Sequence, residues 1–373
     1  MSDAADTRMT PETTPLEERL IRLIKANGPI TIADYMADAL GHPHDGYYTT
    51  RNAIGAEGDF TTAPEITQIF GELVGLWLVQ SWIDLGEPAA FNLIELGPGR
   101  GVLMADVMRA ARLRPDFART AHLYLVEASG RLRHEQQQRL AAVGSLKLDW
   151  LDSFDDAPEG PCLIVANEFF DCLPIRQFVR RDTGWREQLV GLNDDQTGLG
   201  FIDAAAPPLP ETPLPDAAAV ERGCVYEVSE EADTLARTIA RRLKDHPGRA
   251  LIIDYGRLQS GAGDTLQAVR GHAFWPVLAS PGRADITAHV DFEAIANAAI
   301  ETGAGVFGPI PQGAFLENLG LSARLERLCA GKAPKVQAEI HAGAHRVAAP
   351  SQMGEIVKAL CISAPQLPRP PAF

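Results

Sequence analysis

The amino-acid sequence predicts an α/β protein with a mainly parallel central sheet, and two observations lead to that fold class. Short apolar segments alternate along the chain with amphipathic segments of helical length, which is the pattern of strands joined by crossover helices. A glycine-rich turn follows the first of these apolar segments, as in sheets that bind a ligand at the strand ends. The 373 residues, 46% hydrophobic and 22% charged, suffice for one large α/β domain with additions or for two domains.

Residues 1–74 are predicted to form an N-terminal helical extension and an active-site loop. Two helices are expected between residues 16 and 40, because apolar residues recur on one helical face and Thr31 can cap the second helix. Residues 41–64 contain many turn-forming residues and few periodic apolar ones. We expect a long loop there, and long loops in compact domains are often functional.

Residues 75–373 are predicted to form the main domain, and a helix expected over residues 65–86 leads into it. The sheet is expected to contain four short apolar strands. These strands are predicted at residues 91–95, 122–127, 162–166 and 250–254, with helices after Gly101 and Ser129. Residues 176–204 alternate in the manner of antiparallel strands, and a proline-rich segment follows them. This pattern predicts an inserted α+β subdomain at about residues 175–225.

The composition excludes several classes of protein. The formal net charge of −15 argues against general affinity for nucleic acid, because binding DNA or RNA requires lysine and arginine to neutralise phosphates. The five cysteines are scattered without a C-x-x-C pair, so we predict neither a disulfide framework nor a bound metal. The N-terminal segment lacks an apolar signal core, and no apolar stretch reaches the roughly 18 residues that membrane spanning requires. We therefore expect a cytoplasmic protein that does not insert into membranes.

The turn "ELGPGRG" combines the carboxylate of Glu95 with three glycines, Gly97, Gly99 and Gly101. Glycines at a strand-to-helix turn let backbone amides approach a ligand that side chains would block. The dinucleotide fingerprint spaces its glycines as G-x-G-x-x-G, whereas this turn reads G-x-G-x-G, and Glu95 would repel a pyrophosphate. The alternative interpretation is that these glycines only form a tight turn.

A cationic ligand explains the position of Glu95 better than a dinucleotide does. S-adenosylmethionine contains no phosphate, and it carries a sulfonium and an ammonium group that a carboxylate attracts. Glu127 ends the next predicted strand, where a carboxylate can accept both ribose hydroxyls. We therefore predict S-adenosylmethionine as the cofactor, with contacts from Glu95, Gly97, Gly99, Gly101 and Glu127.

The third predicted core strand ends in "ANEFFDC", which places Asn167, Glu168 and Asp171 beside two phenylalanines. Ligands of open parallel sheets lie beyond the carboxyl ends of the strands, so this segment is expected to face the cofactor. Carboxylates can grip a guanidinium, whose pKa lies above about 12, and leave one of its nitrogens nucleophilic. We predict that Asn167, Glu168 and Asp171 form the methyl-transfer site, and a helix cap with surface acids is the alternative.

Three details complete the predicted site. If the chain turns helical after Ala166, Glu168 and Asp171 share one helical face. Asp254 and Tyr255, at the end of the next predicted strand, are a weaker second candidate for the acceptor site. The loop before the first domain helix could bring Glu65 to the same place.

Eight segments of the chain resemble, in order, the MidA family of class I methyltransferases. The segments are "DGYYTT", "GDFTTAPEITQIFGE", "IELGPGRGVLMADVMR", "VEASGRLRHEQQQRL", "ANEFFDCLPIRQF", "DYGRLQSGAGDTLQAVRGH", "DITAHVDF" and "MGEIVKAL". The similarity extends from about residue 16 to about residue 362 and includes the predicted insertion. A series of this length is specific to the family.

The resemblance implies a Rossmann-like class I methyltransferase sheet and a protein arginine methyltransferase that uses S-adenosylmethionine. It further implies that the acceptor is an arginine of a respiratory complex I subunit, methylated during assembly. By motif, the resemblance assigns the cofactor contacts and the methyl-transfer site to the residues named above. Cys172 stands where the resemblance leads us to expect alanine, a departure that should not affect binding. No mitochondrial presequence is recognisable, as expected of a bacterial member.

Two other classes of function compete with this hypothesis. The first is a non-catalytic assembly chaperone for complex I that binds its partner and possibly S-adenosylmethionine. Such a chaperone could lose Glu168 and Asp171 freely, so their presence favours the enzyme. The second is a nicotinamide oxidoreductase, which the glycine spacing and Glu95 disfavour. The oligomeric state is not predicted, although a homodimer is possible.

Overall fold

The computed structural model describes residues 11–51, 61–144, 146–206, 210 and 213–373. Within this part, the chain forms two compact units, each discontinuous in sequence. The core unit contains the described residues of Ile54–Leu173, Ser229–Ala262 and Ala288–Phe373, and the second unit contains those of Met1–Ala53, Pro174–Val228 and Gly263–Thr287. This partition differs from the expected division after residue 74, because the helix that crosses that position lies within the core unit.

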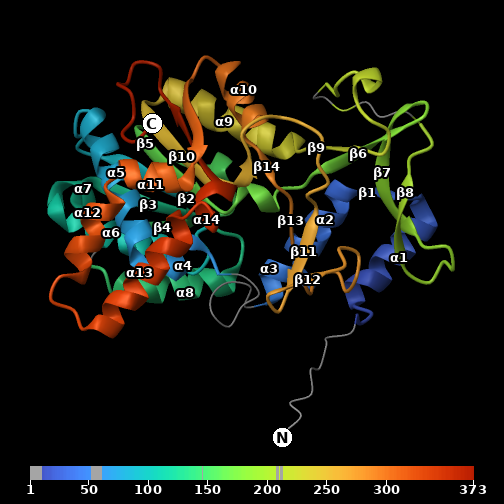
Figure 1. Ribbon diagram of the computed structural model, residues 1–373, viewed down its shortest axis with the longest axis horizontal. Helices are drawn as coiled ribbons and strands as arrows, with labels where there is room; N and C mark the ends of the chain where they lie inside the picture. Colours follow the sequence, from blue (N-terminus) through green and yellow to red (C-terminus); the bar gives the residue numbers. More distant parts are fainter. Residues whose placement is uncertain (1–10, 52–60, 145, 207–209, 211–212) are drawn as a thin grey trace, which may run out of the picture. The chain divides into compact units, whose positions relative to one another are not determined.

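The core unit is built on an eight-stranded sheet (Figure 1). Its strands are β2 (Phe91–Leu96), β3 (Ala121–Val126), β4 (Lys147–Leu151), β5 (Cys162–Asn167), β10 (Gly248–Arg257), β14 (Val290–Asp291), β15 (Gly305–Pro311) and β16 (Val357–Ser363). The order is β15-β16-β10-β5-β2-β3-β4, and β14 pairs with the end of β10. All pairs are parallel except those of β16, which is antiparallel to both β10 and β15.

The predicted α/β fold with a mainly parallel sheet is confirmed. The four strands predicted from sequence are β2, β3, β5 and β10, with small shifts at their ends. The other four strands, β4, β14, β15 and β16, were not predicted. Edge strand β4 is only partly buried, so its sequence "KLDWL" lacks the continuous apolar character that marks the central strands.

Helices cover both faces of this sheet. The described helices of the core unit are α4 (Ala63–Ile66), α5 (Gln68–Asp84), α6 (Val102–Ala110), α7 (Pro115–Thr120), α8 (Gly130–Ala141), α9 (Glu230–Asp245), α10 (Phe292–Ile300), α11 (Gln312–Asn318), α12 (Leu321–Cys329), α13 (Pro334–Ala348) and α14 (Met353–Ile356). The helix expected over residues 65–86 is divided at Thr67, whose side chain accepts from the Ile69 amide and begins α5.

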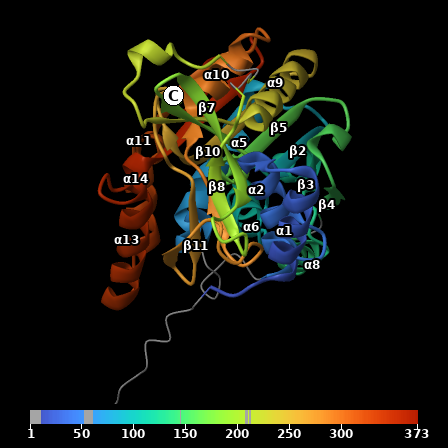
Figure 2. The same cartoon turned by 90° about the vertical axis from the view of Figure 1, so that its right-hand side faces the viewer.

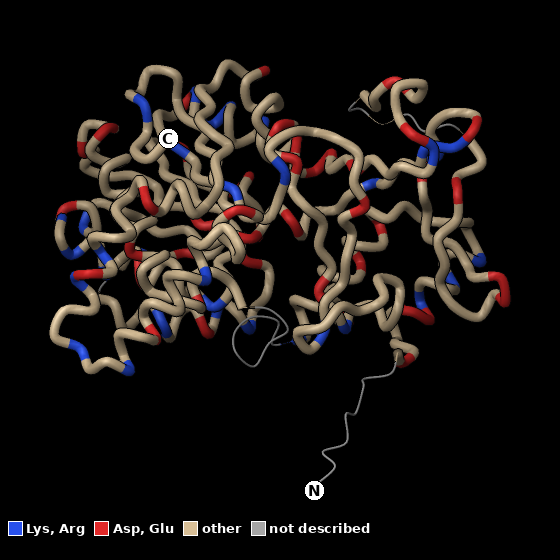
Figure 3. Tube along the Cα trace, viewed as in Figure 1, with Lys and Arg blue, Asp and Glu red and all other residues tan. Residues whose placement is uncertain are grey.

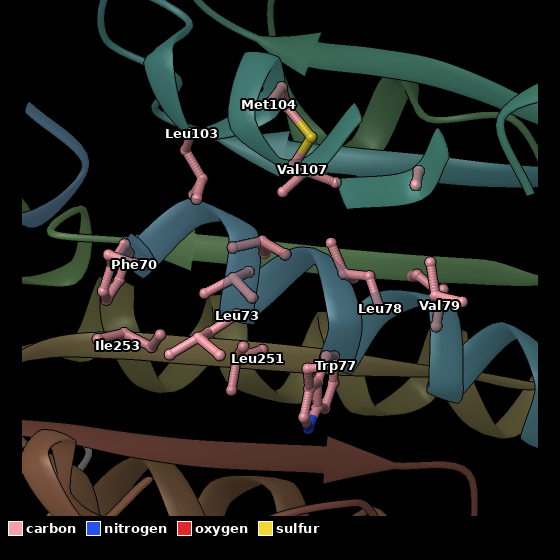
Figure 4. Close-up of a cluster of buried hydrophobic side chains, with 14 of the residues drawn as sticks. Phe70, Leu73, Trp77, Leu78, Val79, Leu103, Met104, Val107, Leu251 and Ile253 are labelled. Carbon is pink, nitrogen blue, oxygen red and sulfur yellow. The ribbon is translucent and has the colours of Figure 1, made fainter. Parts of the chain in front are cut away.

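Alternate residues of the central strands face opposite layers. Leu93 and Leu251 pack in one apolar cluster with α5 and α6, whereas Ile94 and Ile252 pack in a second cluster with α9 and α10. Figure 4 shows α5 between β10 and α6, with Leu251 on one side of the helix and Met104 on the other. Because both faces are buried, each central strand is apolar along most of its length.

Among its described residues, the second unit has two small antiparallel sheets, three α-helices and a 3-10 turn at Ala217–Ala219. One sheet contains β1 (Ile30–Thr31), β6 (Arg176–Arg181), β7 (Gly184–Leu192), β8 (Leu199–Asp203) and β9 (Val225–Val228), and the other contains β11 (Gln267–Arg270), β12 (Ala273–Trp275) and β13 (Asp285–Thr287). The helices are α1 (Pro15–Asn27), α2 (Ile32–Gly41) and α3 (Tyr47–Thr50). Figure 2 shows this unit from the side of β7 and β8.

The local predictions for the second unit are largely confirmed. The antiparallel strands expected in residues 176–204 are β6, β7 and β8. Both N-terminal helices form, and Thr31 caps α2 in a reciprocal capping box with Asp34. The loop expected over residues 41–64 contains the short helices α3 and α4, and its residues 52–60 lie outside the described residues.

Acidic and basic residues are distributed along both units, as Figure 3 shows for the Cα trace. None of the described helices combines the length and the apolar content that crossing a membrane requires.

Candidate functional site

Five of the eight predicted site residues line one pocket at the carboxyl ends of β2 and β5 in the core unit, and they are Glu95, Gly97, Gly99, Asn167 and Glu168. Gly101, Glu127 and Asp171 do not line it. The other lining residues come from the segment around α4, the glycine turn and the start of α6. They are Thr62, Pro64, Glu65, Pro98, Arg100, Val102 and Leu103. This is the place at which open parallel sheets bind their ligands.

The glycine turn between β2 and α6 needs its glycines for backbone reasons. Gly97, Gly99 and Gly101 have φ angles of 62°, 51° and 77°, which lie in the left-handed region that favours glycine. A Cβ atom on Gly97 would lie 2.5 Å from Cδ2 of Phe169, so a side chain there would collide with the segment after β5. At Gly97 and Gly99, the turn therefore presents bare backbone to the pocket.

Glu95 is a buried carboxylate at the end of β2. Its side chain is nearly inaccessible, and Oε2 has no hydrogen-bond partner among the described residues. Burial, together with the negative charge of Glu127, raises the pKa of Glu95 to about 8. A buried carboxylate oxygen without a donor is costly unless a ligand supplies one. The ammonium group of an amino-acid moiety is such a donor, so this position fits S-adenosylmethionine.

Glu127, the residue after β3, is held by two hydrogen bonds. Its Oε1 accepts from the backbone amide of Ser129 at 2.8 Å, and its Oε2 accepts from Nε2 of Gln136 at 3.2 Å. Burial raises the pKa of Glu127, and these two hydrogen bonds oppose the shift. The carboxylate is thus oriented beside the glycine turn with acceptor capacity remaining, which suits a ribose diol.

Asn167 and Glu168 lie on the other side of the pocket, at the end of β5. Glu168 has a φ angle of 50°, and its Oε1 accepts from the Ala63 amide at 2.8 Å and from Nδ2 of Asn167 at 3.3 Å. Oδ1 of Asn167 is buried without a hydrogen-bond partner among the described residues. Left-handed backbone in a non-glycine residue is uncommon and is often found at functional sites.

Comparison with known proteins identifies the family. A family model described as putative S-adenosyl-L-methionine-dependent methyltransferase matches residues 73–310. The chain belongs to this methyltransferase family. The mitochondrial protein arginine methyltransferase NDUFAF7 of Danio rerio is 36% identical over 91% of this chain and 84% of its own length. The human protein of the same name is 34% identical over 92% of this chain and 82% of its own length.

A solved structure agrees with this assignment. A related protein from Burkholderia thailandensis was crystallised with S-adenosyl-homocysteine. Its structure has a TM-score of 0.81 to the structure of this chain, and its sequence is 26% identical. The match covers 98% of this chain and 97% of that chain. The predicted family, methyltransferase activity, Rossmann-like fold and cofactor are thereby confirmed. The protein is an S-adenosylmethionine-dependent methyltransferase.

The methyltransferase does not turn helical where the sequence suggested. Strand β5 extends to Asn167, Glu168 adopts its left-handed conformation, and a single 3-10 turn follows at Phe170–Cys172. The expectation that Glu168 and Asp171 share one helical face is therefore wrong. Asp171 lies in the 3-10 turn, is almost fully buried, and does not line the pocket that contains Glu168.

Asp254 on β10 explains this conformation. Its Oδ2 accepts hydrogen bonds from the amides of Phe169, Phe170 and Asp171 at 3.0, 2.8 and 3.2 Å. Its Oδ1 accepts from the Tyr255 amide at 2.8 Å. Burial raises the pKa of this carboxyl to about 7, while the four hydrogen bonds act in the opposite direction. Asp254 thus shapes the segment after β5.

Sequence analysis missed two polar residues of the methyltransferase site. Arg100, within the glycine turn, lies 3.7 Å from Oε1 of Glu65 and 3.4 Å from Oε2 of Glu135. Gln136 lies beneath the turn and is completely buried. The position of Arg100 between two glycines was a usable signal. Gln136 belongs to a polar run, "EQQQR", in which the sequence alone does not distinguish it from its neighbours.

No metal site was predicted, and the described residues contain no group of three or more histidine, cysteine, aspartate or glutamate residues that could hold a metal ion. The pair His42 and His44, which resembles half of a metal site in sequence, is used locally. Nδ1 of His42 accepts from the amide of Asp45 at 3.2 Å. The free thiols Cys162 and Cys361 are buried.

Proposed function

We propose that this methyltransferase N-methylates an arginine of a protein, and that the protein is a respiratory complex I subunit undergoing assembly. The main observation is the polar pair Asn167 and Glu168, which lines the same pocket as the glycine turn. The names of the curated relatives, which are protein arginine methyltransferases, support arginine as the acceptor. The complex I subunit rests on the family resemblance noted in the sequence.

The proposed cofactor contacts follow from the geometry of the glycine turn. Glu95 would pair with the ammonium group, because its buried Oε2 needs a donor. Glu127 would accept the ribose hydroxyls, and the glycines Gly97, Gly99 and Gly101 would leave room for the ligand. When bound, S-adenosylmethionine supplies an activated methyl group on its sulfonium, so the chief task of the protein is to orient the acceptor.

The proposed acceptor contacts are Glu168, Asp171 and Asn167. A carboxylate that grips a guanidinium localises the positive charge on the bound nitrogens and leaves another nitrogen more nucleophilic. Oδ1 of Asn167 can accept an N–H, because it is buried and none of the described residues donates a hydrogen bond to it. Burial and then the negative charges of Glu168 and Asp171 raise the pKa of Tyr255, so both carboxylates lie close to one phenol. We assign this neighbourhood to the acceptor side.

Glu168→Gln tests the proposed function. This change keeps the size of the side chain and removes its charge, so methyl transfer should fall about 100-fold or more while cofactor affinity stays nearly unchanged. Methyl incorporation is measured on purified complex I subunits or on a peptide that contains the target arginine. Binding of S-adenosylmethionine is measured separately by calorimetry. Glu339→Gln, an exposed change on α13, serves as the matched control.

The outcomes separate the alternatives. Normal methylation by the Glu168→Gln protein would refute the role assigned to this residue. Loss of cofactor binding would place Glu168 in the cofactor site instead. An inactive wild-type protein that binds its partner tightly would favour the assembly chaperone. The cytoplasmic location stays a prediction, which cell fractionation tests, and analytical ultracentrifugation determines the oligomeric state.

A further inference from the structure

Gln136 connects three elements around the cofactor side of the pocket. It lies on α8 and has no solvent exposure. Its Nε2 donates to the carbonyl oxygen of Gly99 at 2.7 Å and to Oε2 of Glu127 at 3.2 Å. Its Oε1 accepts from the indole Nε1 of Trp150, on β4, at 2.7 Å. One buried amide therefore links the glycine turn, the end of β3 and β4.

The neighbours of Gln136 fix the orientation of its amide. The Gly99 carbonyl can only accept a hydrogen bond, whereas the Trp150 indole can only donate one. The reversed amide would place an oxygen against the carbonyl acceptor and an amine against the indole donor. The side chain also packs under the turn, because a Cβ atom on Gly101 would lie 3.3 Å from Cγ of Gln136. The hydrogen bonds thus fix the orientation of the Gln136 amide, and the packing fixes the side chain under the turn.

We propose that Gln136 is a positioning residue that fixes Glu127 and the Gly99 peptide in the arrangement that selects a ribose with both hydroxyls. The inference rests on the proposed role of Glu127 in ribose binding. The Ser129 amide holds one oxygen of Glu127 and Gln136 holds the other, so the plane of the carboxylate is fixed. A carboxylate has about four lone-pair sites, and two donors leave capacity for a diol.

Gln136→Glu is the direct test, because glutamate has nearly the same shape but places a second carboxylate against Glu127 and the Gly99 carbonyl. The control is Gln137→Glu, the same change at the adjacent, exposed position of α8. Calorimetry measures the affinity of the full-length proteins for S-adenosyl-homocysteine and for its 2′-deoxy analogue. The ratio of the two affinities reports the recognition of the ribose hydroxyl independently of the overall strength of binding.

The wild-type protein and the Gln137→Glu control should prefer S-adenosyl-homocysteine over the 2′-deoxy analogue by about tenfold or more, the value of a hydrogen bond to a charged group. In Gln136→Glu, the ratio of the two affinities should fall toward one, because the affinity for S-adenosyl-homocysteine decreases more than the affinity for the 2′-deoxy analogue. If Gln136→Glu does not fold, the same two affinities are measured for Gln136→Met, which keeps the length of the side chain and removes its hydrogen-bond donors.

Two results would overturn the inference. Equal loss of affinity for both ligands would show that Gln136 only supports the fold of the turn, and an unchanged preference would show that it does not act on ribose recognition. Glu127→Gln distinguishes this failure from failure of the underlying assignment. If Glu127→Gln keeps the preference, the ribose role of Glu127 is wrong. If it abolishes the preference and the Gln136 variants do not, only the role of Gln136 is wrong.

Discussion

Two buried carboxylates on opposite sides of β5 differ in what satisfies them. Glu95 is on β2 and Asp254 is on β10, and these strands flank β5 in the sheet. Burial raises the pKa of Glu95 to about 8 and that of Asp254 to about 7. Asp254 accepts hydrogen bonds from four backbone amides, whereas Oε2 of Glu95 accepts none from the described residues.

The difference shows how to separate a structural carboxylate from a binding carboxylate when both are buried and both have perturbed pKa values. The protein itself compensates the desolvation of Asp254, so its function is to shape the backbone after β5. The desolvation of Glu95 is left for a ligand to compensate, so this residue suits a binding role. Changes to the two carboxylates and to the glycine turn test this contrast.

The largest effect is expected from Gly99→Val, which closes the ligand space beside Glu95. The φ angle of Gly99 is 51°, a conformation that a β-branched residue seldom adopts, and the new side chain would occupy the space assigned to the methionyl moiety. Calorimetry should detect no binding of S-adenosyl-homocysteine to this variant, and no binding of NAD to the wild-type protein. Circular dichroism checks the fold. Tight NAD binding without response to either sulfur compound would contradict the cofactor assignment.

Asp254→Ala should destabilise the protein strongly, because it leaves four backbone amides without their acceptor. The free energy of unfolding should fall by about 3 kcal/mol or more. Asp254→Asn keeps one oxygen acceptor and should cost less. Urea denaturation measures both values, with the exposed Asp245→Ala as a control that should change stability by no more than about 0.5 kcal/mol. Unchanged stability of Asp254→Ala would remove the contrast with Glu95.

Glu95→Gln should leave the ligand-free protein at least as stable as the wild type, because Oε2 of Glu95 accepts no hydrogen bond from the part of the chain that the structure describes. The affinity for S-adenosyl-homocysteine should fall about 10- to 100-fold through loss of a charge-assisted hydrogen bond to the ammonium group. Thermal unfolding and calorimetry give the two quantities. A variant that binds normally but unfolds easily would show that Glu95 is structural, like Asp254.

The smallest effect between neighbouring conditions is a pH dependence of the ligand-free stability, compared one pH unit apart. The folded pKa of Glu95, about 8, lies above the usual value of 4.5. The neutral form is thus favoured by folding, and its stabilising contribution is full below pH 4.5 and is lost as the pH rises through about 8. Relative to Glu95→Gln, the wild type should lose on the order of 1 kcal/mol per pH unit within this window. Denaturant titrations of both proteins at several pH values measure the difference, and a constant difference would contradict the shift.

The parts of the fold that were predictable from sequence have local signals. Strands β2, β3, β5 and β10 are apolar runs followed by polar or glycine residues, and the glycines themselves mark the turn after β2. The capping role of Thr31 is readable from the four residues of its capping box. Strand β16 was missed because its register depends on two partners far away in sequence. The grouping of residues 263–287 with the N-terminal helices has no local signal at all.

The candidate site shows the same limit. Glu95, Gly97 and Gly99 were correctly placed together with Asn167 and Glu168, because strand ends in a parallel sheet share one edge. The departure of Asp171 from this pocket could not be predicted, since it depends on amides that Asp254 binds from another strand. Gln136 escaped notice because its role depends on the burial of one glutamine among three consecutive ones.

The position of β16 has a consequence for biosynthesis. This strand lies between β10 and β15, yet it is made after both. While the ribosome has not yet released residues 357–363, the neighbouring edges of β10 and β15 have no partner within the sheet. Unpaired edges invite association with other chains. A nascent chain can therefore contain the strands that carry the glycine turn and Glu168 before β16 completes the sheet. We expect chaperones to bind the nascent chain during this interval.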